Sequence, residues 1–255
     1  MARLPAGPPR QLALDLPNQP ALRREDFLAA PGNAAALALI DAFPDWPSRV
    51  ACLVGPDGAG KSHLAAIFAE RSGALTLAAR DLVREAVPAA LARDALVLED
   101  LDPATFSEPA LFHLLNLARE QQAYLLMTAR TPPSGFALAT ADLASRLRAV
   151  PVFEIAPADD ALLAAVLVKL FADRQLRPGM DLLTYLLTRM ERSLDAARRV
   201  VAALDRASLA AHRPLTVPLA REVLAELDHE TGGKDDGSGN RRPPRHRVRS
   251  QQGAG

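Results

Sequence analysis

The residues best suited to chemistry lie in one short loop, residues 55–62, which fits the pattern G-x-x-x-x-G-K-S/T of the phosphate-binding P-loop. Glycines at this spacing let the backbone curl until successive N–H groups face an anion, and a following helix adds the positive end of its dipole. The lysine would reach the β- and γ-phosphates, and the serine hydroxyl would complete a Mg²⁺ shell. The predicted nucleotide-binding residues are Gly55, Pro56, Asp57, Gly58, Ala59, Gly60, Lys61, Ser62 and His63. The sequence therefore predicts a site for a nucleoside triphosphate or diphosphate.

The segments on either side of this loop decide whether the motif is meaningful. An apolar run, Val50–Val54, leads into it, and residues 63–70 follow with helical spacing of their apolar side chains. A glycine-rich turn before an ordinary helix is the alternative, but the strand–loop–helix context favours the P-loop. The single cysteine, Cys52, falls inside the predicted strand, where a buried core thiol is expected rather than a reactive one.

A second candidate site is the acidic pair Glu99 and Asp100, which ends a buried apolar strand beginning at Ala95. A carboxylate at this edge of a parallel sheet can hold Mg²⁺ through water, and the next acid can position an attacking water. In isolation, a solvated acidic turn would be the better interpretation. The position of the pair, about 40 residues after the P-loop, favours a Walker B segment with Ser62 and Glu99 as the metal-binding residues.

The remaining apolar patterns predict the elements that position these residues. Further strands are expected at residues 75–78, 124–128 and 152–155, and helices at residues 34–43, 81–87, 108–121 and 142–147. Five strands alternating with helices define an α/β fold with a five-stranded parallel sheet. After Asp159 only helical patterns recur, at residues 162–171, 182–190, 196–211 and 219–227. The expected organisation is an arm (1–22), a P-loop α/β core (23–157), a C-terminal helical lid domain (158–228) and a disordered basic tail (229–255).

Composition narrows the functional classes. The chain of 255 residues is 49% apolar and 24% charged, as in soluble globular proteins, and it lacks the run of about 20 apolar residues that a membrane span needs. No apolar h-region follows the N-terminal arginines, so no secretory signal is predicted and the cytoplasm is expected. Residues 229–255 hold six Lys or Arg against three acids, leaving a slightly acidic body. That balance disfavours a broad DNA-binding face.

One apolar island stands in the otherwise polar and proline-rich arm, with its leucines alternating. Its candidate binding residues are Gln11, Leu12, Leu14 and Leu16. Such a pattern is typical of a short peptide that docks in extended form in a partner's groove. Taken alone, an edge strand or a hydrophobic clasp on the chain's own domain is the better interpretation, because short patterns of this kind arise often by chance.

The order and spacing of these features resemble an AAA+ module, and more narrowly the DnaA replication-initiator family. Residues 112–116 (Phe-His-Leu-Leu-Asn) resemble that family's F-H-x-x-N segment, residues 142–147 are similar to its box VII, and residues 204–208 to its lid. The resemblance extends from about Arg23 to Leu227. The sequence has no counterpart to the helicase-interaction and helix-turn-helix domains of the initiators, and in this it resembles the small DnaA homologues called Hda. Hda proteins carry a sliding-clamp-binding peptide of the type QL-x-L-x-L near the N-terminus, which the island at residues 11–16 matches.

The resemblance implies a function as well as a fold. It implies an ADP- or ATP-binding protein with Mg²⁺ that is held by the DNA polymerase sliding clamp (beta), stimulates ATP hydrolysis by a DnaA-type initiator and so restrains replication initiation. The chain would contact DNA only indirectly, through the clamp, and no membrane is involved. A homo-oligomer is a further expectation, because AAA+ modules place an arginine finger in the site of a neighbouring subunit. Arg146, in box VII, would be the arginine finger in trans and Asp100 the second catalytic residue. Thr128 would be the polar group at sensor 1. Arg198 would be the sensor 2 arginine by spacing, and a shift of one residue would assign that role to Arg199.

Two departures from the family bear on catalysis by the chain itself. Glu99 stands where Asp is usual, and Ala129 stands where DnaA-type proteins carry the sensor 1 acid. These differences predict at most weak intrinsic hydrolysis. The alternative function is a DnaC-like ATP-dependent helicase loader, which would need a helicase-binding N-terminal segment and a competent ATPase centre. A P-loop kinase is a third class, but the sequence contains no sign of a second substrate site.

Overall fold

The computed structural model describes residues 22–232, which fall into two compact units, residues 22–157 and 158–232. Each unit has its own apolar core, and each is described by itself. Helix α9, the last of the chain's described elements, continues to Gly232, beyond the predicted end of the lid at residue 228. Within the described residues, no helix is both long and apolar enough to cross a bilayer.

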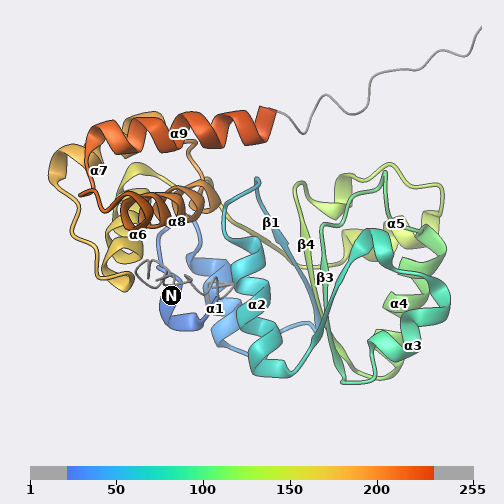
Figure 1. The fold of residues 1–255 in the computed structure, drawn as a ribbon. Helices are drawn as coiled ribbons and strands as arrows, with labels where there is room; N and C mark the ends of the chain where they lie inside the picture. Colours follow the sequence, from blue (N-terminus) through green and yellow to red (C-terminus); the bar gives the residue numbers. More distant parts are fainter. Residues whose placement is uncertain (1–21, 233–255) are drawn as a thin grey trace, which may run out of the picture. The chain divides into compact units, whose positions relative to one another are not determined.

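The first unit is built on a parallel sheet of five strands in the order β2-β3-β4-β1-β5 (Figure 1). The strands are β1 (Val50–Val54), β2 (Leu75–Ala78), β3 (Ala95–Glu99), β4 (Tyr124–Ala129) and β5 (Val152–Glu154). All five strands agree with the sequence prediction to within one residue at each end. Because β4 lies between β1 and β3, the P-loop strand and the acidic strand are second neighbours and meet at the same sheet edge.

Helices cover both faces of this sheet, which is why its strands are apolar on both sides. The first face is covered by α1 (Ala34–Asp41) and α2 (Lys61–Ser72), and the second by α3 (Val87–Ala90), α4 (Glu108–Glu120) and α5 (Ala141–Arg148). The side chains of Leu53, Val97 and Leu126 pack on the α2 face, while those of Cys52 and Leu98 pack on the opposite face. The alternation follows from the two-residue repeat of a strand.

The prediction of a helix over residues 81–87 was wrong. Two short 3₁₀ turns occupy this region, η2 (Ala79–Asp81) and η3 (Arg84–Ala86), and α3 begins only at Val87. Pro88 does not end a helix, because it lies in the first turn of α3, where the N–H that proline lacks has no intrahelical partner. Further 3₁₀ turns are η1 (Arg24–Asp26) and η4 (Pro133–Gly135).

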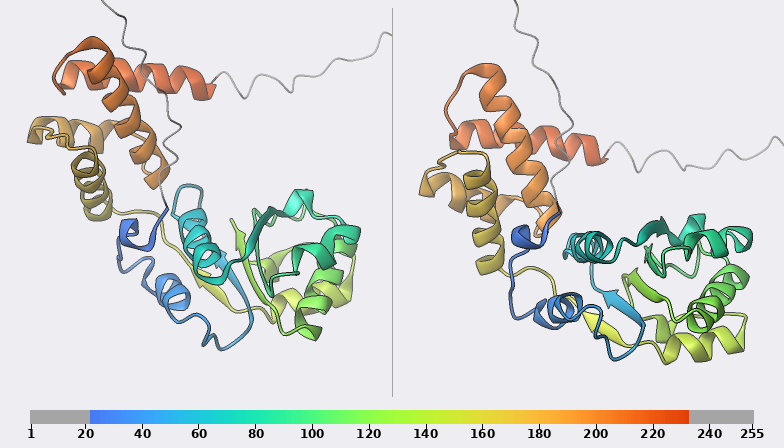
Figure 2. Two further views of the ribbon diagram at one scale, coloured as in Figure 1. Left: turned by 60° about the horizontal axis from the view of Figure 1, so that its bottom comes forward. Right: turned by 90° about the horizontal axis from the view of Figure 1, so that it is seen from below.

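The second unit consists of four helices, α6 (Asp160–Asp173), α7 (Met180–Arg189), α8 (Leu194–Ala211) and α9 (Val217–Gly232). Figure 2 shows them packed as one bundle, coloured from gold to red. Side-chain caps begin two of them: Asp159 accepts from the Leu162 N–H at 2.7 Å, and Ser193 accepts from the Ala196 N–H at 3.1 Å. The predicted helical lid, without strands, is confirmed.

Candidate functional site

The P-loop connects the end of β1 to the start of α2 and owes its path to its glycines. Gly58 and Gly60 have φ of 70° and 103°, values that glycine adopts without the strain a side chain would cause. Gly55 is required for a different reason, because a Cβ there would lie 2.4 Å from the Ile155 carbonyl oxygen. The Gly55 N–H donates to the Ala129 carbonyl at 3.2 Å, which continues the β1–β4 ladder into the loop. The backbone is therefore held in a tight turn at the sheet edge.

Lys61 and Ser62 occupy the first turn of α2, where backbone N–H groups have no intrahelical acceptor. The Lys61 side chain is buried, and its Nζ donates to the carbonyls of Gly55 and Pro56, both at 2.8 Å. Ser62 is exposed. The loop thus encloses a cation at the positive end of a helix of twelve residues, an arrangement suited to bind phosphate.

Glu99 and Thr128 lie on the face of the sheet that α2 covers. Glu99 lies two residues after Val97, and Thr128 lies two residues after Leu126. Val97 and Leu126 pack in the same apolar cluster as Ile67 of α2, and strand residues two positions apart share a face. The Oε1 atom of Glu99 is buried and has no hydrogen-bond partner within the part of the chain that the structure describes. A buried carboxylate oxygen without a donor is costly, and a bound cation or an ordered water would remove the cost.

The second acid departs from the strand. Asp100 is exposed and has a φ of 57°, so its side chain leaves the ladder that holds Glu99. The fully buried Thr128 holds this turn: its hydroxyl accepts from the Asp100 N–H at 3.0 Å, and its carbonyl accepts from the Leu101 N–H at 2.8 Å. Thr128 therefore fixes the backbone beside Glu99, a role that the sequence did not indicate.

His63 is buried and connects the P-loop helix to the segment that precedes α1. Its Nε2 lies 2.9 Å from the Arg23 carbonyl oxygen, and its ring packs edge-on against Phe27, with the ring centroids 5.2 Å apart. Through these contacts, the segment that contains Arg23 and Phe27 packs against the first turn of α2, next to the P-loop. The predicted nucleotide contact of His63 stays a prediction.

Arg146 lies at the opposite end of the strands from the P-loop. It contributes to a pocket with Arg49 and Val50, at the start of β1, and with Val150, which precedes β5. A strand of five residues spans about 16 Å, beyond the reach of an arginine side chain. Arg146 therefore does not reach the P-loop of its own chain. Its guanidinium lies over the ring of Phe112, 4.8 Å from the centroid.

Two hydrogen bonds from the loop before α5 set the position of this helix. Glu108, the first residue of α4, accepts from the Ala139 and Thr140 N–H groups, each at 2.9 Å. Bonds from Thr140 and Ala139 lower the pKa of the Glu108 carboxyl. Because Thr140 is the residue preceding α5, the carboxylate ties the start of the helix that carries Arg146 to the start of α4.

The remaining predicted residues lie elsewhere. Arg198 and Arg199 belong to α8 in the second unit, where Arg198 pairs with Asp195 at 3.3 Å and Arg199 with Glu191 at 3.2 Å. Their sensor 2 role stays a prediction. The predicted clamp-binding residues lie outside the described residues, and they are Gln11, Leu12, Leu14 and Leu16.

Sequence reasoning missed Arg130, which follows the end of β4. Its guanidinium pairs with the carboxylate of Asp57 in the P-loop at 2.7 Å. Arg130 also lines an open pocket of about 450 Å³ together with Arg80, Asp100 and Asp102. The available signal was its position, because a charged residue directly after a parallel strand lies at the edge where ligands bind.

The arrangement fits a nucleotide with Mg²⁺. The glycine turn leaves no room for a Cβ at Gly55, Lys61 supplies a cation, and Glu99 has a carboxylate oxygen with no described partner. Among the residues described, no group of three or more His, Cys, Asp and Glu side chains is positioned to hold a metal by itself. Such a site suits Mg²⁺, which proteins commonly hold through one or two side chains together with phosphate oxygens and water.

Comparisons with known proteins agree with this fold. Residues 160–224 match the family described as "Hda, lid domain". Domain III of the Thermotoga maritima replication initiation protein DnaA is similar at 16% identity and a TM-score of 0.69, over 81% of this chain and 97% of that chain. AMPPCP-bound DnaA from Aquifex aeolicus is similar at 17% identity and a TM-score of 0.61, over 85% and 71%. The Thermotoga maritima RuvB Holliday junction branch migration motor is similar at 18% identity and a TM-score of 0.59, over 76% and 67%.

The five-stranded sheet with its P-loop, followed by a helical lid, is the fold of an AAA+ module. Within that class the chain is similar in fold to DnaA domain III, and its second unit matches the Hda lid domain over residues 160–224.

Proposed function

We propose that this chain is a nucleotide-bound regulator of replication initiation that stimulates ATP hydrolysis by a DnaA-type initiator while tethered to the sliding clamp. The observation that carries the proposal is the match of residues 160–224 to the Hda lid, in a chain whose P-loop unit has the fold of DnaA domain III. The peptide at residues 11–16 supports the clamp as the tether.

Adenine nucleotide is the resident ligand in this proposal, since a DnaA structure of the same fold is bound to AMPPCP. Lys61 and the first turn of α2 would hold its phosphates, with Thr128 fixing the turn beside them. Ser62 and Glu99 would hold Mg²⁺, which supplies positive charge against the phosphate oxygens. The chain's own hydrolysis is weak or absent, and ADP or ATP serves mainly to stabilise the core and lid in an active arrangement.

Arg146 acts on the partner. It lies a full strand length from its own P-loop, so the nucleotide that it contacts in this proposal is bound by another subunit. Placed at the initiator's ATP, its guanidinium spreads positive charge over the transferring phosphoryl group, an effect worth 10³–10⁵ in rate in other NTPases. Phe112 holds the side chain at the surface by a cation–π contact.

The first experiment is binding of the purified chain to the clamp, measured for the wild type and for Gln11→Ala/Leu12→Ala/Leu14→Ala. Tight binding that disappears in the triple variant supports the tether. A matched control, Asn18→Ala/Gln19→Ala, changes the same arm outside the peptide and should bind normally. Wild-type protein that does not bind the clamp would refute the tether, and binding to the replicative helicase would then favour the loader.

The second experiment measures ATP turnover by a DnaA-type initiator in the presence of the chain and clamp-loaded DNA. Wild-type protein is expected to accelerate turnover, and Arg146→Ala to abolish the acceleration while still binding nucleotide and clamp. Arg148→Ala, on the same helix, is the control for a general loss of positive charge. Equal acceleration by Arg146→Ala and the wild type would refute the arginine finger.

A further inference from the structure

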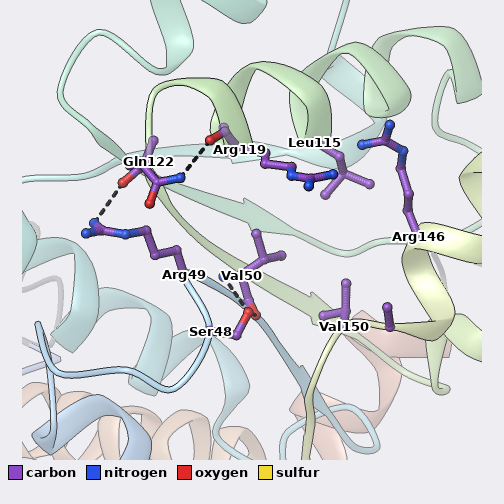
Figure 3. Close-up of a pocket in the computed structure, with 11 residues that line it drawn as sticks. Ser48, Arg49, Val50, Leu115, Arg119, Gln122, Arg146 and Val150 are labelled. Atoms are coloured by element: carbon purple, nitrogen blue, oxygen red, sulfur yellow. Dashed lines mark hydrogen bonds between the residues drawn. The ribbon is translucent and has the colours of Figure 1, made fainter.

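A second pocket, of about 360 Å³, lies at the sheet edge where β1, β4 and β5 begin (Figure 3). It is distinct from the nucleotide site, which lies where β1 ends. Its apolar lining comes from the start of β1, from α4 and from the segments that precede β4 and β5. These residues are Val50, Leu115, Ala118, Ala123 and Val150.

Three arginines surround this apolar lining, and no Asp or Glu is among the lining residues. Figure 3 shows Arg119 of α4 and Arg146 of α5 directed toward the same pocket, with Arg49 on its other side. Arg49 donates to the Gln122 carbonyl at 2.8 Å and lies over the ring of Tyr124, 4.6 Å from its centroid.

The charges of these arginines are poorly compensated. Arg146 contacts an aromatic face rather than a carboxylate, and within residues 22–232 the Arg119 guanidinium makes no hydrogen bond or ion pair. Like charges around one apolar depression repel each other, and an entering carboxylate would relieve that repulsion through charge-assisted hydrogen bonds. The lining thus fits a group that is acidic at one end and apolar beside it.

The occupant is a protein side chain rather than a small cofactor for two reasons. The pocket is open to the surface, and its volume lies near the lower limit of about 300 Å³ for small-molecule sites. More importantly, Arg146 both lines the pocket and serves as the finger in the proposed function. Any subunit close enough to receive Arg146 therefore lies next to this pocket.

We propose that the pocket receives an acidic side chain and an adjoining apolar side chain from the AAA+ subunit that Arg146 engages. The proposal rests on the proposed function and names the contact that selects the partner. Arg119 and Arg49 supply affinity and orientation, while Arg146 supplies the charge for catalysis. Recognition and stimulation are then separable, because they depend on different arginines of one surface.

The test measures the affinity of the full chain for the ATP-bound initiator, together with stimulation of the initiator's ATPase. Arg119→Glu reverses one pocket charge at an exposed position and should weaken the complex about 10–100-fold, most at low salt. Ala149→Trp fills the pocket from the exposed end of α5 without changing any charge, and should weaken the complex to a similar extent. The matched controls, Arg84→Glu and Ala92→Trp, make the same changes at exposed positions outside the pocket and should bind as the wild type does.

Four outcomes are informative. Weaker binding by both pocket variants, with stimulation restored at saturating concentration, supports the proposal. Unchanged binding by both variants, with stimulation lost in Arg146→Ala, refutes the pocket but leaves the proposed function intact. If Arg119→Glu and Arg84→Glu weaken the complex equally and Ala149→Trp binds as the wild type does, the pocket proposal is refuted, because nonspecific electrostatic attraction then explains the affinity. A wild-type chain that neither binds nor stimulates the initiator refutes the proposed function, and the pocket assignment with it.

Discussion

Replacing Gly55 by alanine tests the geometry of the nucleotide site most directly. The added Cβ would lie 2.4 Å from the Ile155 carbonyl oxygen, closer than a carbon and an oxygen can approach. That carbonyl cannot retreat easily, because the Ile155 N–H is bonded to the Val54 carbonyl at 2.7 Å and holds the segment against β1. Relief therefore requires a backbone shift on one side of the turn. Overpacking of this kind costs about 1–3 kcal/mol.

The single tryptophan provides a local assay. Trp46 is buried in the first unit and stacks on Phe68, with ring centroids 4.8 Å apart, so its fluorescence reports unfolding of this unit rather than of the lid. The loss of folding stability in Gly55→Ala should lower the urea midpoint by roughly 0.5–1.5 M. Because the shift occurs in the P-loop, the affinity for a fluorescent ADP analogue should fall as well.

Gly135→Ala is the matched control. Its added Cβ would meet no atom within 4 Å, and the substitution should be neutral or stabilise the fold by up to about 1 kcal/mol. Gly55→Ala with a wild-type midpoint and wild-type ADP affinity would refute the close approach of β5 to the P-loop. An equal loss of stability in both variants would exclude the clash with Ile155 as the cause, because a Gly→Ala change acts on the unfolded chain in the stabilising direction.

Three further predictions concern the first unit. Thr128→Val removes the hydroxyl that accepts from the Asp100 N–H and should lower the free energy of unfolding by about 1 kcal/mol, whereas an unchanged urea midpoint would show that water replaces this bond. Burial raises the pKa of Cys52 to about 12, so a thiol reagent at pH 8 should label it only after urea unfolding, and rapid labelling of the folded protein would contradict its burial. The hydrogen bond from Arg24 lowers the pKa of the Asp41 carboxyl below its ordinary value, so the pair stabilises the fold above the unfolded-state pKa and less as the pH falls through the folded-state pKa. Asp41→Asn should accordingly lower the urea midpoint at pH 7 and lower it by progressively less as the pH falls through the folded-state pKa of Asp41, and a loss that does not change with pH would exclude the charge as the cause.

The sequence alone determined the elements and much of the nucleotide site. The spacing of Gly55, Gly60 and Lys61 between an apolar run and a helical pattern predicts a P-loop, because strand, turn and helix depend on neighbouring residues. The two-residue repeat of the strands and the helical repeat of the lid are equally local. Local patterns failed at residues 81–87, where helical spacing was present but the chain forms short 3₁₀ turns.

Only the tertiary structure decided which of these residues meet. The order β2-β3-β4-β1-β5 places β4 between the P-loop strand and the acidic strand, and so brings the Thr128 hydroxyl to the Asp100 backbone. It also brings Arg130 to Asp57, and Arg119 and Arg146 to one pocket at the far edge. These contacts join residues far apart in the chain, and their pairing depends on strand order and register, which no local repeat encodes.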